Sequence, residues 1–230
     1  MQKTKNHIDF PFLTLLIAIM GVIIVFSVVH KLEDVYASPE IKSTLVIDAG
    51  HGGIDGGAVA EDGTKECDIN LAISLKLMTL AEFYGENTVM TRIDNRPRTD
   101  MESYSEREDL IHRTEIINGV QNAALISVHQ NSYPTGQPSG AQVLYAQSES
   151  SKAFGTITHA NLINALDPAN RRVAEPAPES LYITSHAACP AILVECGFMS
   201  NFSDIQKLKD NIYQTQLATV LMASYFRKGI

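Results

Sequence analysis

The stretch TLVIDAGHGG, residues 44–53, joins a short apolar run to a glycine-rich loop. Its first five residues, TLVID, are mostly apolar or β-branched, which predicts a buried β-strand. The loop that follows, AGHGGIDGGA at 49–58, is rich in glycine, which predicts a tight turn. We therefore expect a strand at 44–48 whose carboxyl end leads into a glycine-rich loop.

Strand-like and helical patterns alternate along the rest of the chain. Residues 66–83 place Ile69, Ile73 and Leu77 at helical spacing, which predicts an amphipathic helix with one buried face. This alternation, without an internal repeat, predicts a three-layer α/β domain with a mixed, mostly parallel sheet and helices on both faces. Further strands are expected at 88–91, 124–128 and 142–145, and brief apolar runs lie at 181–184 and 191–194. Further helices are expected at 104–118, at 154–166 and in the C-terminal region, where Ser203 would cap the first helix.

Four ionisable residues stand at the ends of these elements. His51 follows the first strand, Glu66 opens a helix, and His129 and Glu195 follow later apolar runs. Ligands of open α/β sheets bind in the crevice outside the carboxyl ends of the strands. Two imidazoles and a carboxylate, with a fourth position left for water, match the ligand set of a catalytic zinc site. The four residues therefore indicate a candidate metal site.

Each of these residues also has an ordinary structural explanation. His51 could be a turn residue, and Glu66 could complement the positive end of a helix dipole. His129 alone could be a hydrogen-bonded core histidine. The spacing of the three residues is not a short zinc motif such as H-E-x-x-H. From the residues alone, the metal site stays a candidate.

Longer strings around these positions resemble a known family. They are similar to the signature blocks of the zinc-dependent N-acetylmuramoyl-L-alanine amidases (amidase type 3), and they occur in the family's order. The resemblance extends over roughly residues 44–228. The strings are DAGHGG (48–53), KECDIN (65–70), SVHQNS (127–132) and LVECGFMSN (193–201), with weaker matches at TRIDNR (91–96) and RTEIIN (113–118).

The resemblance implies a site and a reaction. His51, Glu66 and His129 would hold Zn²⁺, and Glu195 would be the catalytic residue that acts on the bound water. The enzyme would hydrolyse the amide bond between N-acetylmuramic acid and L-alanine in peptidoglycan. The chain departs from the family at Gln130, where alanine is usual. We expect this larger amide, next to a ligand, to crowd or hydrogen-bond the substrate.

The N-terminal run FLTLLIAIMGVIIVFSVV, residues 12–29, contains no charged residue. As a transmembrane helix it would be about 27 Å long, nearly the thickness of the hydrocarbon core. Two lysines precede it, so the positive-inside rule places the short N-terminus in the cytoplasm and the rest of the chain outside. We expect residues 1–37 to form the cytoplasmic tip, anchor and linker, and residues 38–230 the amidase catalytic domain. Cleavage near residues 35–37, which would give a secreted protein, stays open.

Charge and cysteine content restrict the partners. Three basic and three acidic residues lie before residue 38, so the whole net charge of −8 belongs to the expected catalytic domain. An acidic domain repels phosphate backbones, which argues against nucleic-acid binding. Cys67, Cys189 and Cys196 are too few for a disulfide framework, and whether any two of them pair stays open.

The domain layout resembles one branch of the family. A lone catalytic domain behind an N-terminal membrane segment is similar to the germination-specific amidases of spore-forming bacteria, which prepare spore cortex for muramic-δ-lactam formation. Such an enzyme would act between the forespore and mother-cell membranes, with an extracytoplasmic protein partner as activator. The alternatives are a vegetative autolysin of the same family, a zinc peptidase that trims the stem peptide, and a catalytically silent binding protein.

Overall fold

The computed structural model describes residues 19–22, 42–96 and 103–228. The chain divides into two compact units, Met1–Ile41 and Lys42–Ile230. In the first unit, residues 19–22 are described, and they are helical and exposed. The expected membrane helix at 12–29 therefore lies largely outside the described residues. Within the described ranges, no helix has the length and apolar character needed to cross a bilayer.

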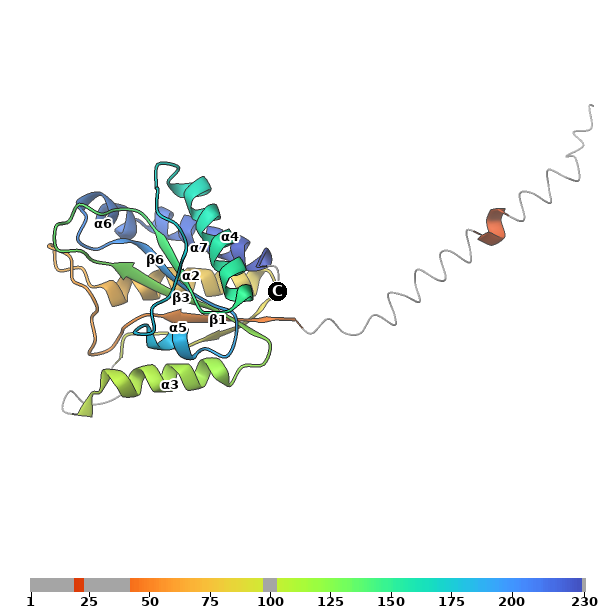
Figure 1. The fold of residues 1–230 in the computed structure, drawn as a ribbon, viewed down its shortest axis with the longest axis horizontal. Helices are drawn as coiled ribbons and strands as arrows, with labels where there is room; N and C mark the ends of the chain where they lie inside the picture. Colours follow the sequence, from red (N-terminus) through yellow and green to blue (C-terminus); the bar gives the residue numbers. More distant parts are fainter. Residues whose placement is uncertain (1–18, 23–41, 97–102, 229–230) are drawn as a thin grey trace, which may run out of the picture. The chain divides into compact units, whose positions relative to one another are not determined.

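The described part of the second unit is built on a six-stranded sheet (Figure 1). The strands are β1 (Thr44–Ala49), β2 (Asn87–Met90), β3 (Ala123–Asn131), β4 (Gln142–Tyr145), β5 (Glu175–Pro176) and β6 (Ala191–Phe198). Their order is β2-β1-β3-β6-β4-β5, in which β4 is antiparallel to β6 and the other neighbouring pairs are parallel. The expectation of a mixed, mostly parallel sheet is confirmed.

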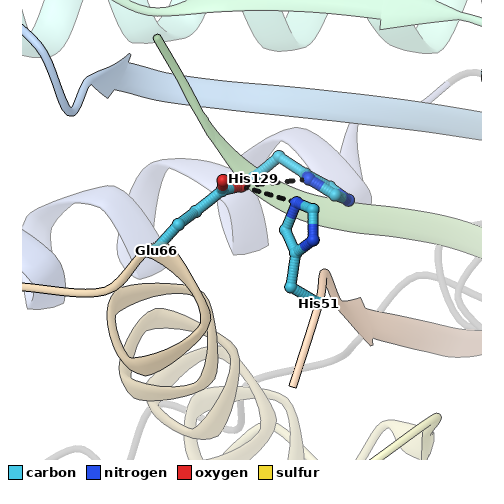
Figure 2. A group of neighbouring side chains, drawn as sticks. All are labelled: His51, Glu66 and His129. Atoms are coloured by element: carbon cyan, nitrogen blue, oxygen red, sulfur yellow. Dashed lines mark hydrogen bonds and ion pairs between the residues drawn. The ribbon is translucent and has the colours of Figure 1, made fainter. Parts of the chain in front are cut away.

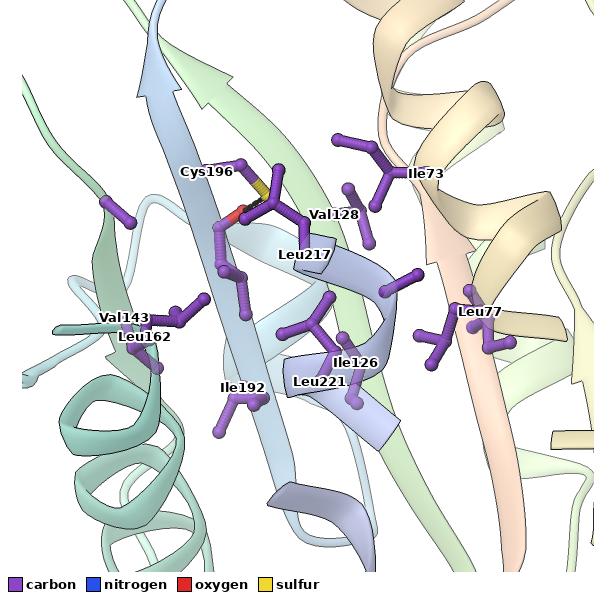
Figure 3. Close-up of a cluster of buried hydrophobic side chains, with 14 of the residues drawn as sticks. Ile73, Leu77, Ile126, Val128, Val143, Leu162, Ile192, Cys196, Leu217 and Leu221 are labelled. Carbon is purple, nitrogen blue, oxygen red and sulfur yellow. Dashed lines mark hydrogen bonds between the residues drawn. The ribbon is translucent and has the colours of Figure 1, made fainter. Parts of the chain in front are cut away.

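Helices cover both faces of this sheet. They are α2 (Glu66–Phe83), α3 (Glu106–Asn118), α4 (Glu149–Leu166), α5 (Tyr182–His186), α6 (Phe202–Lys209) and α7 (Asn211–Phe226). Side chains of α2, α4, α6 and α7 share one buried cluster with the central strands. Figure 3 shows members of this cluster from α2, α4 and α7 beside those of the strands. Helices α3 and α5 contribute Ile117 and Ile183 to a second cluster on the opposite face. The three-layer arrangement is thus as expected.

The central strands direct alternate side chains to the two faces. We call the cluster under α2, α4, α6 and α7 the α2–α7 cluster, and the cluster under α3 and α5 the α3–α5 cluster. In β3, Val128 belongs to the α2–α7 cluster, whereas Leu125 belongs to the α3–α5 cluster. In β6, Cys196 packs in the α2–α7 cluster, so its neighbour Glu195 points to the other side. All three cysteines are free thiols.

Two predicted helix starts are wrong. Helix α4 begins at Glu149 and not at residue 154, because Ser148 caps a polar first turn that has no apolar periodicity. Asn201, and not Ser203, caps α6: its side-chain oxygen accepts hydrogen bonds from the backbone amides of residues 203 and 204. Ser203 therefore lies inside the first turn of the helix.

Candidate metal centre

Three elements bring His51, Glu66 and His129 together at the carboxyl edge of the sheet (Figure 2). His51 follows β1, Glu66 is the first residue of α2, and His129 lies in β3. One ligand atom from each lies within 4.8 Å of the other two. His51 Nε2 is 3.3 Å, and His129 Nδ1 is 3.2 Å, from Glu66 Oε1. The histidine side chains are 26% and 18% exposed, so the group is accessible from solvent.

The glycine-rich loop permits this close approach. His51 has a φ of 58°, in the left-handed region that is uncommon for residues other than glycine. A Cβ at Gly50 would lie 2.3 Å from the His129 ring, and a Cβ at Gly57 would lie 2.6 Å from Glu66 Oε2. Larger residues at these two positions would therefore displace a candidate ligand.

Asp55 orients His51 from within the same loop. Its Oδ2 lies 2.6 Å from His51 Nδ1, and its Oδ1 accepts a hydrogen bond from the Gly57 amide at 2.9 Å. Burial lowers the pKa of His51, but hydrogen bonds to Asp55 and Glu66 outweigh it and raise the pKa to about 10. Sequence reasoning missed Asp55, although a carboxylate four residues after His51 was an available signal.

Backbone and side-chain donors fix the carboxylate of Glu66. Its Oε1 accepts hydrogen bonds from the Gln130 amide at 3.0 Å and from the Asn70 side chain at 3.2 Å. Its Oε2 accepts from the Ala58 amide at 2.9 Å. Burial raises the pKa of Glu66, but hydrogen bonds to the two histidines and their charges have a larger, opposite effect. The pKa of Glu66 is therefore well below its usual value. Glu66 is therefore held ionised.

We expected Gln130 to crowd or hydrogen-bond the substrate, but its side chain lies in the interior of the domain. Because successive side chains of a strand point to opposite faces, Gln130 is directed away from its neighbour His129. It is buried, and its Nε2 donates to Asn70 Oδ1 at 3.1 Å. Asn70 in turn donates to Glu66 and to the carbonyl of Gly50. Gln130 therefore supports Glu66 from the interior through Asn70.

Two arginines hold the backbone of the His51 loop. Arg113 of α3 donates to the carbonyls of Ala49 and His51, and its guanidinium lies 3.2 Å from the buried carboxylate of Asp48. Arg92 donates to the carbonyls of the two residues before His51, at 2.7 and 2.9 Å. These guanidinium groups therefore fix the conformation of the loop that presents His51.

Glu195 lies in β6, opposite His129 of β3 in the sheet register. Both residues lie within their strands and not after them, because β3 and β6 continue to Asn131 and Phe198. Glu195 Oε2 is buried and has no hydrogen-bond partner in the described part of the chain. Burial raises the pKa of Glu195 to about 7; the negative charge of Glu66 adds to this rise, and His129 and His51 oppose it with smaller contributions. A carboxyl group with this pKa can exchange a proton near neutral pH.

These donors fit a zinc ion. Two imidazoles and one ionised carboxylate match the three protein ligands of a catalytic zinc site, in which water takes the fourth position. The second nitrogen of His51 contacts a carboxylate, which is the usual support of a zinc-bound histidine. The buried, unpartnered oxygen of Glu195 is close enough to the group for the charges of all three residues to affect its pKa.

Comparison with known proteins identifies the family of the chain. The family model described as N-acetylmuramoyl-L-alanine amidase matches residues 45–224. The chain belongs to this family. It is therefore an amidase that acts on peptidoglycan, a substrate that lies outside the cytoplasmic membrane.

Individual relatives agree with this assignment. The germination-specific amidase of Bacillus subtilis is 32% identical over 197 residues, which cover 80% of this chain and 78% of the relative. The amidase LytC of the same organism is 28% identical over 203 residues, covering 86% of this chain and 38% of LytC. The solved structure of the CwlD amidase from Clostridioides difficile, in complex with the GerS lipoprotein, has a TM-score of 0.76 and 32% identity, and the match covers 81% of this chain and 98% of that one.

Proposed function

We propose that this family member uses zinc, held by His51, Glu66 and His129, to cleave the bond between N-acetylmuramic acid and L-alanine. Glu195 is the catalytic residue of this proposal. Its main support is the convergence of three ligand atoms within 4.8 Å beside an unpartnered carboxylate. When bound, zinc polarises the scissile carbonyl and lowers the pKa of a coordinated water from 15.7 to about 7.

Glu195 transfers the proton in this reaction. Its ionised carboxylate accepts a proton from the attacking water. The same carboxyl group then donates the proton to the nitrogen of the departing L-alanine, so the C–N bond breaks. The products are muramic acid with a free lactyl carboxylate and a stem peptide with a free amino terminus.

Mass spectrometry of digested peptidoglycan tests the bond specificity. We expect the zinc-loaded full chain to release intact stem peptides that begin with L-alanine and to leave muramic acid without a peptide. Glu195→Gln protein provides the inactive control. A shortened stem still attached to muramic acid would instead identify a zinc peptidase, and unchanged peptidoglycan would favour a binding protein.

Asp55→Ala is expected to weaken zinc binding by about 10–100-fold, because His51 loses the partner that orients its ring. The fold should persist, since Asp55 lies in a loop and its side chain is 29% exposed. Titration of the metal-free protein against a zinc chelator measures the effect. Asp62→Ala, which removes an exposed carboxylate nearby in the chain, should bind zinc normally. Equal affinities in the two variants would contradict the role of Asp55.

We propose spore cortex as the biological substrate. The similarity to a germination-specific amidase and to CwlD supports this assignment. A strain that lacks the protein should then form cortex without muramic-δ-lactam and germinate poorly. Normal lactam content combined with defective turnover of the vegetative wall would instead favour a vegetative autolysin of the same family.

We also propose that residues 12–29 anchor the protein, with residues 1–37 as tip, anchor and linker and residues 38–230 as the extracytoplasmic catalytic domain. The charge-free run and the location of peptidoglycan support this layout. Because the similar CwlD amidase was solved in complex with a lipoprotein, we propose an extracytoplasmic protein partner here too. Full zinc loading and full activity of the purified protein alone would count against a required activator.

A further inference from the structure

Three exposed aromatic side chains gather on the surface of the catalytic domain. Phe83, Tyr84 and Phe226 are 81%, 57% and 50% exposed. The ring centroids of Phe83 and Tyr84 lie 5.4 Å apart, as do those of Tyr84 and Phe226. We call these three residues the aromatic cluster. Large apolar side chains that adjoin one another in solvent mark a surface suited to contact with a partner or a membrane.

The aromatic cluster lies at the end of the domain remote from the metal centre. Phe83 is the last residue of α2, and the candidate ligand Glu66 is the first. The 18 residues of α2 span about 27 Å at 1.5 Å per residue. Phe226 is likewise the last residue of α7. Figure 1 shows the end of α7 next to the start of β1 at one end of the domain, in agreement with a hydrogen bond between Tyr225 and Ser43.

The chain enters the domain beside this cluster. Lys42 donates a hydrogen bond to the backbone of the turn after Tyr84, and the hydroxyl of Tyr225 donates to the Ser43 carbonyl at 2.9 Å. Residues 30–41 join this point to the apolar run. Such a linker reaches at most about 40 Å. Because a short tether keeps the domain at a high effective concentration near the anchoring bilayer, even a weak contact between them would form most of the time.

The charges next to the cluster are compatible with a lipid surface. Lys42, Arg227 and Lys228 lie at this end of the domain, against the acidic neighbours Glu82 and Glu86. Among these five described neighbours of the cluster, three are basic and two are acidic, although the domain as a whole is acidic. Aromatic rings flanked by lysine and arginine are typical of protein segments at the membrane–water interface.

We propose that the aromatic cluster inserts into the interface of the bilayer that holds residues 12–29. This inference rests on the membrane anchor of the proposed function. The three rings lie among the lipid headgroups, and the adjacent cations lie at the phosphates. Because Glu66 is at the far end of α2, the metal centre then points away from the bilayer and toward the peptidoglycan.

Tryptophan fluorescence tests this orientation, because the chain contains no tryptophan of its own. Full-length Phe83→Trp is reconstituted in phosphatidylcholine–phosphatidylglycerol vesicles whose acyl chains carry bromine near the headgroups. Phe202→Trp is the matched control, since Phe202 is 80% exposed and opens α6 shortly after Glu195. We expect Phe83→Trp to lose about half of its fluorescence and to emit at shorter wavelength. Phe202→Trp should remain unquenched.

Vesicle flotation and hydrolysis of soluble muropeptides separate the ways in which the inference can fail. Protein that does not float with the vesicles overturns both the anchor and the orientation, while normal hydrolysis would leave the zinc amidase proposal intact. Protein that floats, with Phe83→Trp quenched no more than Phe202→Trp, overturns the orientation alone. A blue shift without quenching would show that a protein, and not lipid, covers the aromatic cluster.

Discussion

Glu195→Gln is expected to bind zinc with unchanged stoichiometry and to lose about 10²–10⁴-fold in kcat. Glutamine keeps the size of the side chain, but its amide cannot accept the proton of the attacking water. Zinc binding should persist, because the candidate ligand group consists of His51, Glu66 and His129. Hydrolysis rates and metal content are measured on the same preparation. Near-normal turnover would remove Glu195 from the reaction.

The pH dependence of the wild-type enzyme tests the same role. Burial raises the pKa of Glu195 to about 7, and a carboxyl group accepts a proton only in its ionised form. The rate should therefore fall as the pH drops through this pKa, and a bound cation, which favours the ionised form, places that fall below pH 7. The residual rate of Glu195→Gln should lack this acidic limb. Glu179→Gln, at an exposed glutamate, should keep both rate and limb.

His129→Ala is expected to abolish stable zinc binding and to lower turnover by more than about 10³-fold. Removal of the ring leaves two of the three protein ligands, which is fewer than catalytic zinc sites use. The effect should exceed the 10–100-fold loss typical of residues that only support a ligand. Zinc titration and hydrolysis assays measure both quantities, with His186→Ala, at an exposed histidine, as the control.

Thermal unfolding separates lost metal binding from lost folding. Zinc should raise the melting temperature of the wild type and of Glu195→Gln, because a ligand that binds the native state stabilises it. It should leave the melting temperature of His129→Ala unchanged. The metal-free melting temperatures of His129→Ala and the wild type should be similar. Zinc-dependent stabilisation of His129→Ala equal to that of the wild type would exclude His129 as a ligand.

The sequence predicted the elements whose signals are local. The β-branched run before the glycine-rich loop predicted β1, and the apolar periodicity after Glu66 predicted α2 with the bounds that the structure has. His51, Glu66 and His129 lie together in the structure because they sit at the sheet edge that α/β topology predicts for ligands. Their role as zinc ligands stays a prediction.

Several contacts around the site could not be predicted because they join distant segments. Gln130 is next to a candidate ligand in the sequence, but strand alternation directs its side chain into the interior. There it donates a hydrogen bond to Asn70, which is 60 residues away in the chain. Arg113 is also far from the loop that it holds. A short apolar run at 181–184 likewise did not reveal that α5 is a helix, since five residues are too few for periodicity.

X-ray anomalous diffraction at the zinc absorption edge tests the metal centre most directly. Crystals of the full chain grown with zinc should give one strong peak per molecule, bonded to His51, Glu66 and His129 at about 2.0–2.2 Å. Glu195 should lie beside this peak without bonding to it. A peak held by other residues, or none in crystals of fully zinc-loaded protein, would contradict the proposed zinc centre.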